Sequence, residues 1–282
     1  MSFGSKLGAA ARRLAYRGLD RLFRPLDLGY LHQTPNLARL PDAAHRYGGQ
    51  TGLAEWSHTI GLFQALMFAH LDGKPAPVVL DVGCGTGKLA LAADALLGPD
   101  GRYVGIDIQA EAIDFCRRQH PAPRFAFHHL PARNPFYVAQ AQTRPAWPIP
   151  DASADLVTAV SVWTHFQPED AAFYFAEVER ALRAGGIALL TFFLLDETYQ
   201  RNLDRLAGGR FAFDASCAGS PEWRHPTWAS VPEAQIGVTP EGIHRLLASA
   251  SRLVWIDTTP GHWKGGRGLF LQDVLAFRKR SA

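Results

Sequence analysis

Residues 78–89, VVLDVGCGTGKL, run from an apolar segment directly into three glycines at alternate positions, Gly83, Gly85 and Gly87. The apolar part predicts a buried strand, and the residues after Gly87 predict the start of a helix. Glycine has no Cβ atom and tolerates positive φ, so a ligand can approach a turn of this composition closely. At the carboxyl edge of a parallel sheet, such a turn is a typical ligand-binding position.

Three kinds of ligand site fit a strand, a glycine-rich turn and a helix, and the residue spacing separates them. A phosphate-binding P-loop, G-x-x-x-x-G-K-[ST], requires glycine where Val82 stands and a hydroxyl residue where Leu89 stands. The dinucleotide pattern G-x-G-x-x-G requires its third glycine where Lys88 stands. The sequence therefore excludes a P-loop and weakens the interpretation as a dinucleotide site.

The pattern that remains is D-x-G-x-G-x-G, with Asp81 two residues before the first glycine. The next predicted strand ends in Gly105-Ile106-Asp107-Ile108. A carboxylate at that strand end can accept hydrogen bonds from both hydroxyls of a ribose. We therefore expect Asp107 to contact the ribose of a nucleoside-containing ligand.

Strand and helix patterns alternate from residue 53 to the C-terminal part of the sequence. The strands are apolar without polar alternation, which is typical of a parallel sheet covered by helices on both faces. The sequence therefore predicts an α/β fold with a doubly wound, mainly parallel sheet of seven strands. The predicted strands are 78–82, 103–106, 125–129, 156–160, 187–195, 253–257 and 270–277, and the predicted helices are 53–71, 89–97, 110–119, 169–182 and 240–250.

The regular alternation stops in residues 196–238, which are rich in Gly, Pro and Trp. We expect these residues to form an inserted cap segment on the substrate side of a main domain at residues 53–282. Residues 1–52 are then an N-terminal extension, made of a basic amphipathic helix and a loop.

Residues 3–23 carry apolar side chains at helical spacing with arginines between them. Such a helix either packs on its own domain or on a partner subunit, or lies on an anionic membrane surface. Peripheral membrane contact through residues 1–24 therefore stays open. The apolar residues of this helix are Phe3, Leu7, Ala10, Leu14, Gly18, Leu22 and Phe23.

The composition is that of a globular protein, with 282 residues of which 47% are hydrophobic. A net charge of +3 does not favour a nucleic-acid partner. Three cysteines without paired spacing indicate reduced thiols, and no ligand cluster at metal-binding spacing is visible. No apolar run reaches the roughly 20 residues of a membrane span, and no signal peptide is visible. We expect a cytoplasmic protein without a metal, with the membrane-peripheral alternative given above.

Three segments, in order and spacing, resemble the class I S-adenosylmethionine-dependent methyltransferases. They are LDVGCGTGKLALAA (80–93), YVGIDIQAEAIDFC (103–116) and ADLVTAVSVWTHFQPEDAAFYFAEVERALRAGGIALLTFFLLD (154–196). Within that family they resemble a bacterial subgroup whose members often carry a V-F-T-H segment and a T-F-F-L-L-[ND] strand. The resemblance covers residues 53–196 well and residues 270–277 loosely. It implies a Rossmann-like fold and S-adenosyl-L-methionine as the cofactor.

The resemblance also implies roles for individual residues. The three glycines would pass under the methionine part of the cofactor, and Asp81 would position the loop or meet the amino group. Asp107 would bind the ribose, and Ile108 would pack on the adenine. The predicted cofactor-binding residues are Asp81, Gly83, Cys84, Gly85, Gly87, Asp107, Ile108, Leu130, Pro131 and Ser161.

One departure from the family concerns the adenine. The family often places an acidic residue near the adenine amine after the third strand, whereas this chain has Ala132 at that position. We expect backbone groups there, or Asn134, to take its place.

The segment Ser161-Val162-Trp163-Thr164-His165-Phe166 follows the fourth predicted strand and should lie beside the transferred methyl group. His165 is its ionisable side chain, and an imidazole accepts a proton at neutral pH. His165 is therefore the candidate catalytic base for an acceptor hydroxyl. The alternative is a structural histidine that caps the next helix or binds a backbone carbonyl, and methyl transfer to an amine or thiol needs no base.

The acceptor should be bound by segments outside the core fold, which are 47–58, the insertion and the loop 259–268. Aromatic rings beside polar groups suit sugars or ring-bearing metabolites, and Arg224, Lys264 and Arg267 could pair with a carboxylate or phosphate. A tryptophan-rich segment that packs on itself and solvated loop charges are the alternatives. The predicted substrate-contacting residues are Tyr47, Trp56, Trp163, His165, Trp223 and Trp228.

Together these patterns predict methyl transfer from S-adenosylmethionine to a small molecule or a sugar-containing glycan precursor, with a hydroxyl oxygen as the expected acceptor. Transfer to nitrogen of a small metabolite is the nearest alternative. A non-catalytic cofactor-binding or membrane-associated subunit is the alternative from a different class.

Overall fold

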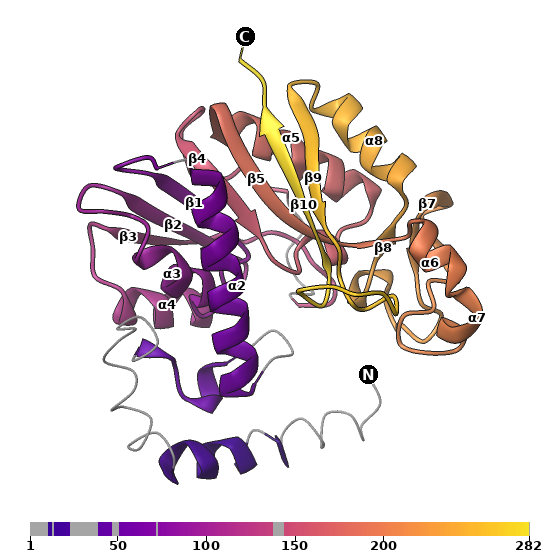
Figure 1. Cartoon of the computed structure of the whole chain (residues 1–282), viewed down its shortest axis with the longest axis horizontal. Helices are drawn as coiled ribbons and strands as arrows, with labels where there is room; N and C mark the ends of the chain where they lie inside the picture. The colour runs from indigo at the N-terminus through magenta and orange to yellow at the C-terminus, as the bar shows by residue number, and fades with distance from the viewer. Residues whose placement is uncertain are drawn as a thin grey trace.

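The computed structural model describes residues 11–12, 14–22, 39–46, 51–71, 73–137 and 144–281. A twisted sheet runs through the middle of the molecule, with helices on both sides (Figure 1). Seven of its strands form the predicted Rossmann-like core in the order β3-β2-β1-β4-β5-β10-β9. They are β1 (Val78–Val82), β2 (Arg102–Asp107), β3 (Phe125–His129), β4 (Ala154–Ala159), β5 (Leu182–Leu194), β9 (Leu253–Thr259) and β10 (Asp273–Lys279).

The first five strands are parallel, and β10 is antiparallel to both of its neighbours, β5 and β9. The order reverses between β1 and β4, which lie side by side although β2 and β3 separate them in sequence. At such a reversal, the chain leaves neighbouring strands in opposite directions and opens a crevice at their carboxyl ends. The glycine-rich turn after β1 lies at this point.

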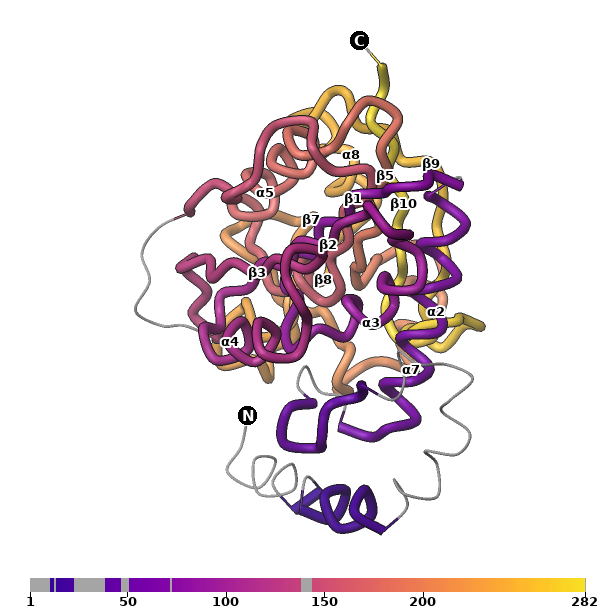
Figure 2. Tube along the Cα trace, turned by 90° about the vertical axis from the view of Figure 1, so that its left-hand side faces the viewer, coloured from indigo at the N-terminus to yellow at the C-terminus, as the bar shows by residue number. Residues whose placement is uncertain are grey.

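Alternate residues of each strand point to opposite faces and feed two apolar cores. Leu80 and Val82 belong to one core, with α5 and α8, whereas Val79 between them belongs to the other, with α2, α3 and α4. Figure 2 shows α5 and α8 apart from α2 and α3, with the strands between them. The flanking helices are α2 (Leu53–Leu71), α3 (Lys88–Asp94), α4 (Ala110–Gln119), α5 (Pro168–Ala181) and α8 (Pro240–Ser249).

The predicted insertion contains regular structure that its composition did not reveal. Three short strands continue the sheet from the carboxyl end of β5, because β8 pairs with β5, β7 with β8, and β6 with β7. The sheet therefore has ten strands in the described chain rather than seven. The elements of the insertion are α6 (Glu197–Arg201), α7 (Leu203–Leu206), β6 (Ala215–Cys217), β7 (Ser220–His225), the 3₁₀ helix η4 (Pro232–Ala234) and β8 (Gly237–Val238).

The last predicted strand is shifted. The sequence predicts 270–277, whereas β10 begins at Asp273, because the residues before it pair with their own loop instead of with the neighbouring strands. The His262 amide donates to the Phe270 carbonyl at 2.9 Å, and the Trp263 amide donates to the Leu271 carbonyl at 3.1 Å. The apolar residues Phe270 and Leu271 therefore belong to the loop between β9 and β10, which we call the late loop (residues 260–272).

Part of the N-terminal extension is described. Residues 11–12 and 14–22 are helical, as the amphipathic pattern predicted, and residues 43–45 form a 3₁₀ helix, η2 (Ala43–His45). This N-terminal helix lies below the main domain in Figure 1. Among the described residues, no helix combines the length and the apolar composition needed to cross a bilayer. Tyr47, predicted to contact the substrate, lies outside the described residues.

Candidate active site

A cavity of about 510 Å³ lies at the carboxyl ends of β1, β2 and β4, where the strand order reverses. Its volume is within the range of about 300–1,000 Å³ that is usual for small-molecule sites. The predicted residues that line it are Trp56, Asp81, Gly83, Cys84, Gly85, Asp107, Ile108, Leu130, Ser161 and His165. Most of the residues that the sequence singled out are therefore close to one another around a single space.

The glycine turn presents bare backbone to this cavity. The amides of Gly83 and Cys84 donate to the Ile106 carbonyl of β2 at 2.8 and 3.1 Å, which ties the turn to the neighbouring strand. Gly85 has φ +50°, and a Cβ atom added there would meet no other atom within 4 Å. A side chain at this position would project into open space. Because glycine has no side chain, a ligand can occupy that space.

Gly83 and Gly87 serve packing. A Cβ atom on Gly83 would lie 2.5 Å from a methyl group of Val162, and one on Gly87 would lie 2.9 Å from the His120 Nε2 atom. Gly87 has φ +84° and does not line the cavity, because it faces α4 instead. The position of Gly85 in the cavity lining supports its predicted contact with the cofactor, whereas the predicted contact of Gly87 has no such support.

Asp107 joins the end of β2 to the glycine turn. One carboxylate oxygen accepts from the Gly85 amide at 2.7 Å, and the other accepts from the Gln109 amide at 2.8 Å. Burial raises the pKa of Asp107, and these amides act in the opposite direction. A carboxylate has about four acceptor positions and the Ile108 amide is a third backbone donor to it, so one position stays available for a ribose hydroxyl.

Asp81 is held more tightly. Its two oxygens accept hydrogen bonds from the hydroxyls of Tyr103 and Thr158, the latter at 2.8 Å. Burial raises its pKa to about 7, although both hydroxyls favour the ionised form. Of the two roles that the sequence left open for Asp81, this geometry favours holding the end of β1 in place.

The wall predicted to face the adenine is apolar. Ile108, Leu130 and Ala132 line the cavity, whereas Pro131 between the latter two does not. Asn134 also lines it, but its side-chain amide donates to the His165 carbonyl at 3.2 Å and its oxygen accepts from the Phe136 amide at 3.0 Å. Asn134 therefore links this loop to the His165 segment, which is a role that the sequence did not predict.

Ser161 is strained and well anchored. It follows β4 with φ +60°, a conformation that is costly for residues other than glycine and concentrates at functional sites. Its amide donates to the Thr191 hydroxyl at 2.7 Å, and its own hydroxyl donates to the Gln272 side-chain oxygen at 3.0 Å. These contacts fix the turn that leads into the next segment, the 3₁₀ helix η3 (Trp163–His165).

His165 has a defined tautomer. Its Nδ1 atom lies 2.7 Å from the Glu233 carbonyl oxygen, and since a carbonyl only accepts, Nδ1 carries the proton. Nε2 of the neutral ring is then an acceptor, and the Tyr137 hydroxyl lies 3.2 Å from it. Burial lowers the pKa of His165, whereas the Glu233 carbonyl opposes this shift. The imidazole is therefore neutral at pH 7, with its basic nitrogen beside the cavity.

The inserted segment holds this histidine. Glu233 belongs to η4, and the Ile236 amide donates to the Thr164 carbonyl at 2.7 Å. The side-chain amide of Gln167 also donates to the Glu233 carboxylate. The insertion thus sets the orientation of the imidazole rather than only covering the substrate.

A row of aromatic rings continues from this point along the cavity. Phe166 stacks on Tyr174 with ring centres 5.1 Å apart, and Tyr174 stacks on Trp147 with centres 6.0 Å apart. All three line the cavity. This wall suits an apolar or ring-bearing acceptor.

The predicted tryptophan contacts need revision. Trp56 lines the cavity, but Trp163 and Trp223 are buried in the apolar core with α5 and α8 and do not line it. Trp228 is exposed and does not line the cavity either. Its indole donates to the Arg210 carbonyl at 3.2 Å, so Trp228 supports Arg210, which does line the cavity.

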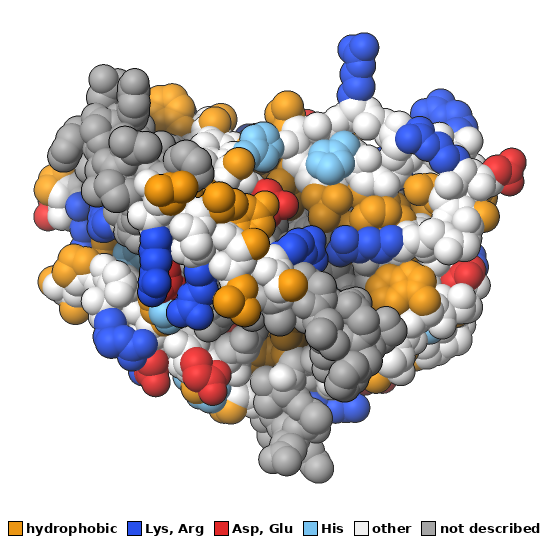
Figure 3. Space-filling model, turned by 90° about the horizontal axis from the view of Figure 1, so that it is seen from below, with side chains coloured by type: hydrophobic (Ala, Val, Ile, Leu, Met, Phe, Trp, Pro, Cys, Tyr) orange, Lys and Arg blue, Asp and Glu red, His pale blue; other side chains and the backbone are white. Residues whose placement is uncertain are grey.

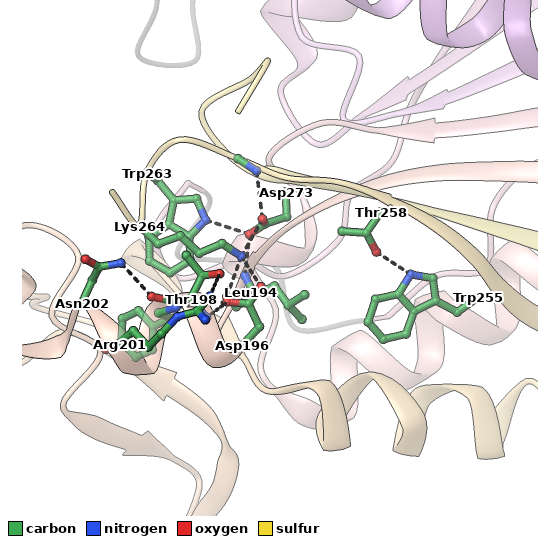
Figure 4. A network of polar contacts seen from close by, with 12 residues as sticks. Leu194, Asp196, Thr198, Arg201, Asn202, Trp255, Thr258, Trp263, Lys264 and Asp273 are labelled. Carbon is green, nitrogen blue, oxygen red and sulfur yellow. Dashed lines mark hydrogen bonds and ion pairs between the residues drawn. The ribbon is translucent and has the colours of Figure 1, made fainter. Parts of the chain in front are cut away.

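Lys264 was a candidate for binding an anionic substrate, and the structure corrects this. Its ammonium group is buried and forms ion pairs with Asp196 at 2.6 Å and Asp273 at 2.8 Å (Figure 4). The Trp263 indole donates to the same Asp273 carboxylate at 2.8 Å. This group of residues, which we call the late-loop clamp (Asp196, Trp263, Lys264 and Asp273), fastens the late loop to the end of β5.

Three further lining residues lie in the two segments that the sequence predicted for the acceptor, since Glu55 and His58 come from 47–58 and His262 from the loop 259–268. Phe270 and Leu271 also line the cavity, although the sequence predicted them to be in the last strand. Lys88 lines the cavity at the start of α3, with its ammonium 4.8 Å from the centre of the Trp56 ring, and burial lowers its pKa to about 8. Tyr137 comes from the loop after β3 and carried no local signal, and Trp147 and Tyr174 look like ordinary core residues in sequence.

Comparison with known proteins finds a domain match and methyltransferases among the relatives. Residues 79–186 match the family described as "Methyltransferase domain". The fatty-acid O-methyltransferase of Mycolicibacterium smegmatis is 29% identical over 194 residues, which cover 66% of this chain and 60% of that protein. The N-demethylindolmycin N-methyltransferase of Streptomyces griseus is 32% identical over 92 residues, which cover 32% of this chain and 38% of that protein. The chain thus spans less than two thirds of the length of either relative.

A solved structure shares the fold. The magnesium protoporphyrin IX methyltransferase of Synechocystis PCC 6803, solved with bound SAH, matches with a TM-score of 0.50 at 15% identity and covers 83% of this chain and 90% of that one. Residues 79–186 are therefore similar to a methyltransferase domain, and the sheet that contains them has the strand order of a doubly wound α/β fold.

The residues of the site fit S-adenosylmethionine, the cofactor that the sequence resemblance implies. Open space beside Gly85 accepts a ligand close to the backbone, and Asp107 keeps an acceptor position at the end of β2. Ile108 and Leu130 supply an apolar wall next to them. S-adenosylmethionine combines a ribose, an adenine and a charged methionine part, and these three surfaces match that combination.

Proposed function

We propose that this protein transfers the methyl group of S-adenosylmethionine to a hydroxyl oxygen of a small molecule or glycan precursor. The observation that carries the proposal is one cavity that contains both the glycine turn with Asp107 and the basic nitrogen of His165. The glycine turn and Asp107 suit the cofactor, and the basic nitrogen of His165 suits an acceptor that must lose a proton. The cofactor, when bound, supplies a methyl group already activated by its positive sulfur.

The chain's own residues would divide the work. Gly85 and Asp107 would hold the cofactor, Asp81 would keep the end of β1 in position, and Ile108 and Leu130 would border the adenine. The cavity would hold the acceptor oxygen against the methyl group that the cofactor supplies. The acceptor proton passes to His165 Nε2, and the Glu233 carbonyl stabilises the resulting imidazolium at Nδ1.

Tyr137 would prepare His165 for this step. Its hydroxyl donates to Nε2 in the absence of substrate, and the surrounding protein raises its pKa to about 12, so it stays protonated. An acceptor hydroxyl can replace it at the same nitrogen. Positioning and proton removal are the two contributions that a protein makes to such a reaction.

The acceptor is proposed to be apolar or ring-bearing, since Phe166, Tyr174 and Trp147 form one wall of the cavity. The fatty-acid O-methyltransferase relative supports an oxygen acceptor on an apolar molecule. Transfer to nitrogen is the second candidate, and the N-demethylindolmycin N-methyltransferase relative favours it.

Methyl-labelled S-adenosylmethionine and a panel of acceptors test the proposal. The panel contains a long-chain alcohol, a phenol, a fatty acid, a monosaccharide and an indole amine, and the label is followed into the acceptor. We expect the alcohol or the phenol to be methylated, with a loss of rate in His165→Ala. Methylation of the amine alone, unaffected by that substitution, would contradict the hydroxyl acceptor in favour of nitrogen.

A further inference from the structure

The N-terminal helix at residues 14–22 is attached to the domain by one narrow face. Asp20 is buried and accepts from the Arg46 guanidinium at 2.8 Å. Arg46 is itself fully buried and donates to the carbonyls of Thr51 at 2.6 Å and Pro41 at 2.9 Å. On the same side of the helix, Tyr16 lies against Gly52. Tyr16 and Asp20 are four residues apart and so share one face of the helix.

The opposite face is apolar and open. Leu14, Gly18 and Leu22 recur at four-residue steps and therefore form a stripe on the side away from Tyr16 and Asp20. Leu14 is 72% exposed, Leu22 is 65% exposed, and Leu19 at the edge of the stripe is 48% exposed. These are large apolar side chains that the described residues of the protein do not cover.

Arginines border this stripe on both sides. At 100° per residue, Arg17 and Arg21 lie on one side of it and Arg12 lies on the other, and all three are exposed. The acidic residue of the described part of this helix is Asp20, whose charge is already matched by Arg46. The open face therefore combines apolar side chains with positive charge, as in helices that lie in a membrane interface.

A second copy of the chain fits this face poorly. Two such helices packed stripe to stripe would bring arginines close to arginines, with no acidic residue in the described part of the helix left to pair with them. A bilayer that contains anionic lipids matches both features, because its headgroups attract the arginines and its acyl chains accept the leucines.

We propose that the helix at residues 11–12 and 14–22 forms a peripheral membrane anchor that binds anionic lipid bilayers through Leu14, Leu19 and Leu22 together with the flanking arginines. The proposal does not depend on the proposed reaction. Figure 3 views the molecule from the side of this helix, and basic and hydrophobic side chains are intermixed over that face.

The anchor is also close to the cavity in the structure. Gly52, which contacts Tyr16, donates its amide to the Glu55 carboxylate at 3.1 Å, and Glu55 lines the cavity. Two hydrogen-bonded or packed steps therefore connect the helix to the cavity wall. A membrane bound at the outer face of the helix would lie on the same side of the protein as the cavity.

Cosedimentation of the full chain with vesicles tests the anchor. The vesicles are phosphatidylcholine alone or phosphatidylcholine with about 30% phosphatidylglycerol, which gives an anionic surface. The wild-type chain should partition into the anionic vesicles and release at high salt. Arg17→Gln with Arg21→Gln should weaken this partitioning about thirtyfold, since each arginine near an anionic surface contributes about a factor of five.

Leu14→Ser with Leu22→Ser should weaken partitioning by about tenfold or more, because two buried apolar side chains are lost. Phe68→Ser is the matched control, since Phe68 is 70% exposed near the far end of α2 and should leave partitioning unchanged. Circular dichroism of each variant checks that the fold is retained.

Three results would overturn the proposal. The first is an absence of binding to anionic vesicles, and the second is equal binding to neutral and anionic vesicles. The third is a wild-type chain that sediments as a dimer, does not bind vesicles and becomes a monomer when the leucines are substituted. A second copy of the chain would then cover the stripe.

Discussion

The two ends of the cavity are built in different ways. The end with the glycine turn comes from residues 81–108, which are close in sequence, and its key contacts are made by backbone amides. The end around His165 is assembled from β4, the insertion, the loop after β3 and the late loop, which are far apart in sequence. The first end depends on local backbone conformation, whereas the second depends on how distant segments pack.

This difference predicts different responses to mutation. A substitution at the glycine end should affect ligand affinity first, because the turn is held by its own strand neighbours. A substitution in the supports of the His165 end should affect stability and turnover together, because each support also joins two segments.

The largest effect is expected at the late-loop clamp. Asp273→Ala would leave the buried Lys264 with Asp196 as its remaining ion-pair partner and would remove the acceptor of the Trp263 indole. Breaking a buried pair in this way costs about 3–5 kcal/mol of unfolding free energy. Urea denaturation measures it, with Asp114→Ala as a control at an exposed pair. A loss below about 1 kcal/mol, as for a surface pair, would contradict the role of the clamp.

Next in size is the loss of the proposed base. His165→Ala should lower kcat for a hydroxyl acceptor on the order of a hundredfold, which is the lower range for general-base catalysis. Affinity for S-adenosylmethionine should change little, since His165 belongs to the other end of the cavity. Steady-state kinetics and calorimetry on the same variant measure both quantities. Full turnover in His165→Ala would limit this histidine to a structural role.

A smaller effect separates two glycines of the same turn. Gly87→Ala should destabilise the fold by about 1–3 kcal/mol, because the added Cβ meets His120 at 2.9 Å in a backbone conformation with positive φ. Gly85→Ala meets no atom, so it should keep more of its stability but lose cofactor affinity. Thermal unfolding and calorimetry of both variants give the comparison. Equal loss of affinity in the two variants would mean that Gly87 also contacts the ligand.

The smallest effect concerns pH. Burial lowers the pKa of His165, so turnover should fall only when the pH drops below the ordinary histidine range near 6.5. Tyr137→Phe removes a donor that stabilises the neutral ring, so the pKa of His165 should rise. The acidic limb of the kcat/KM profile, which reports the free enzyme, should then move upward by less than about one pH unit, as expected for one hydrogen bond. A downward shift would contradict the donor role of Tyr137.

The sequence predicted the core fold well, because its signals are local. Apolar runs and helical spacing gave the ranges of β1, α2, α4 and β3 as the structure has them. The three short strands of the insertion were missed, since β6, β7 and β8 have two to six residues each and depend on pairing with the end of β5. No local pattern encodes that pairing.

The site was predicted unevenly for the same reason. Asp81, Gly85 and Asp107 follow from motif spacing, and all three line the cavity. Trp163 and Trp223 looked like ligand contacts in sequence, but their large apolar rings are more stable in the core. Tyr137 and the Glu233 carbonyl reach His165 only through the tertiary fold, so spacing along the chain could not reveal them.

The most direct test of the account is calorimetric titration of S-adenosylmethionine into the wild-type chain and into Asp107→Ala, with Asp114→Ala as the control for an exposed acidic residue. We expect one site per chain in the wild type and unchanged affinity in the control. In Asp107→Ala the affinity should fall by about a hundredfold, as expected for the loss of a hydrogen bond to a charged group. Wild-type affinity in Asp107→Ala, or no binding to the wild-type chain, would contradict the assignment of the glycine turn and Asp107 as the cofactor site.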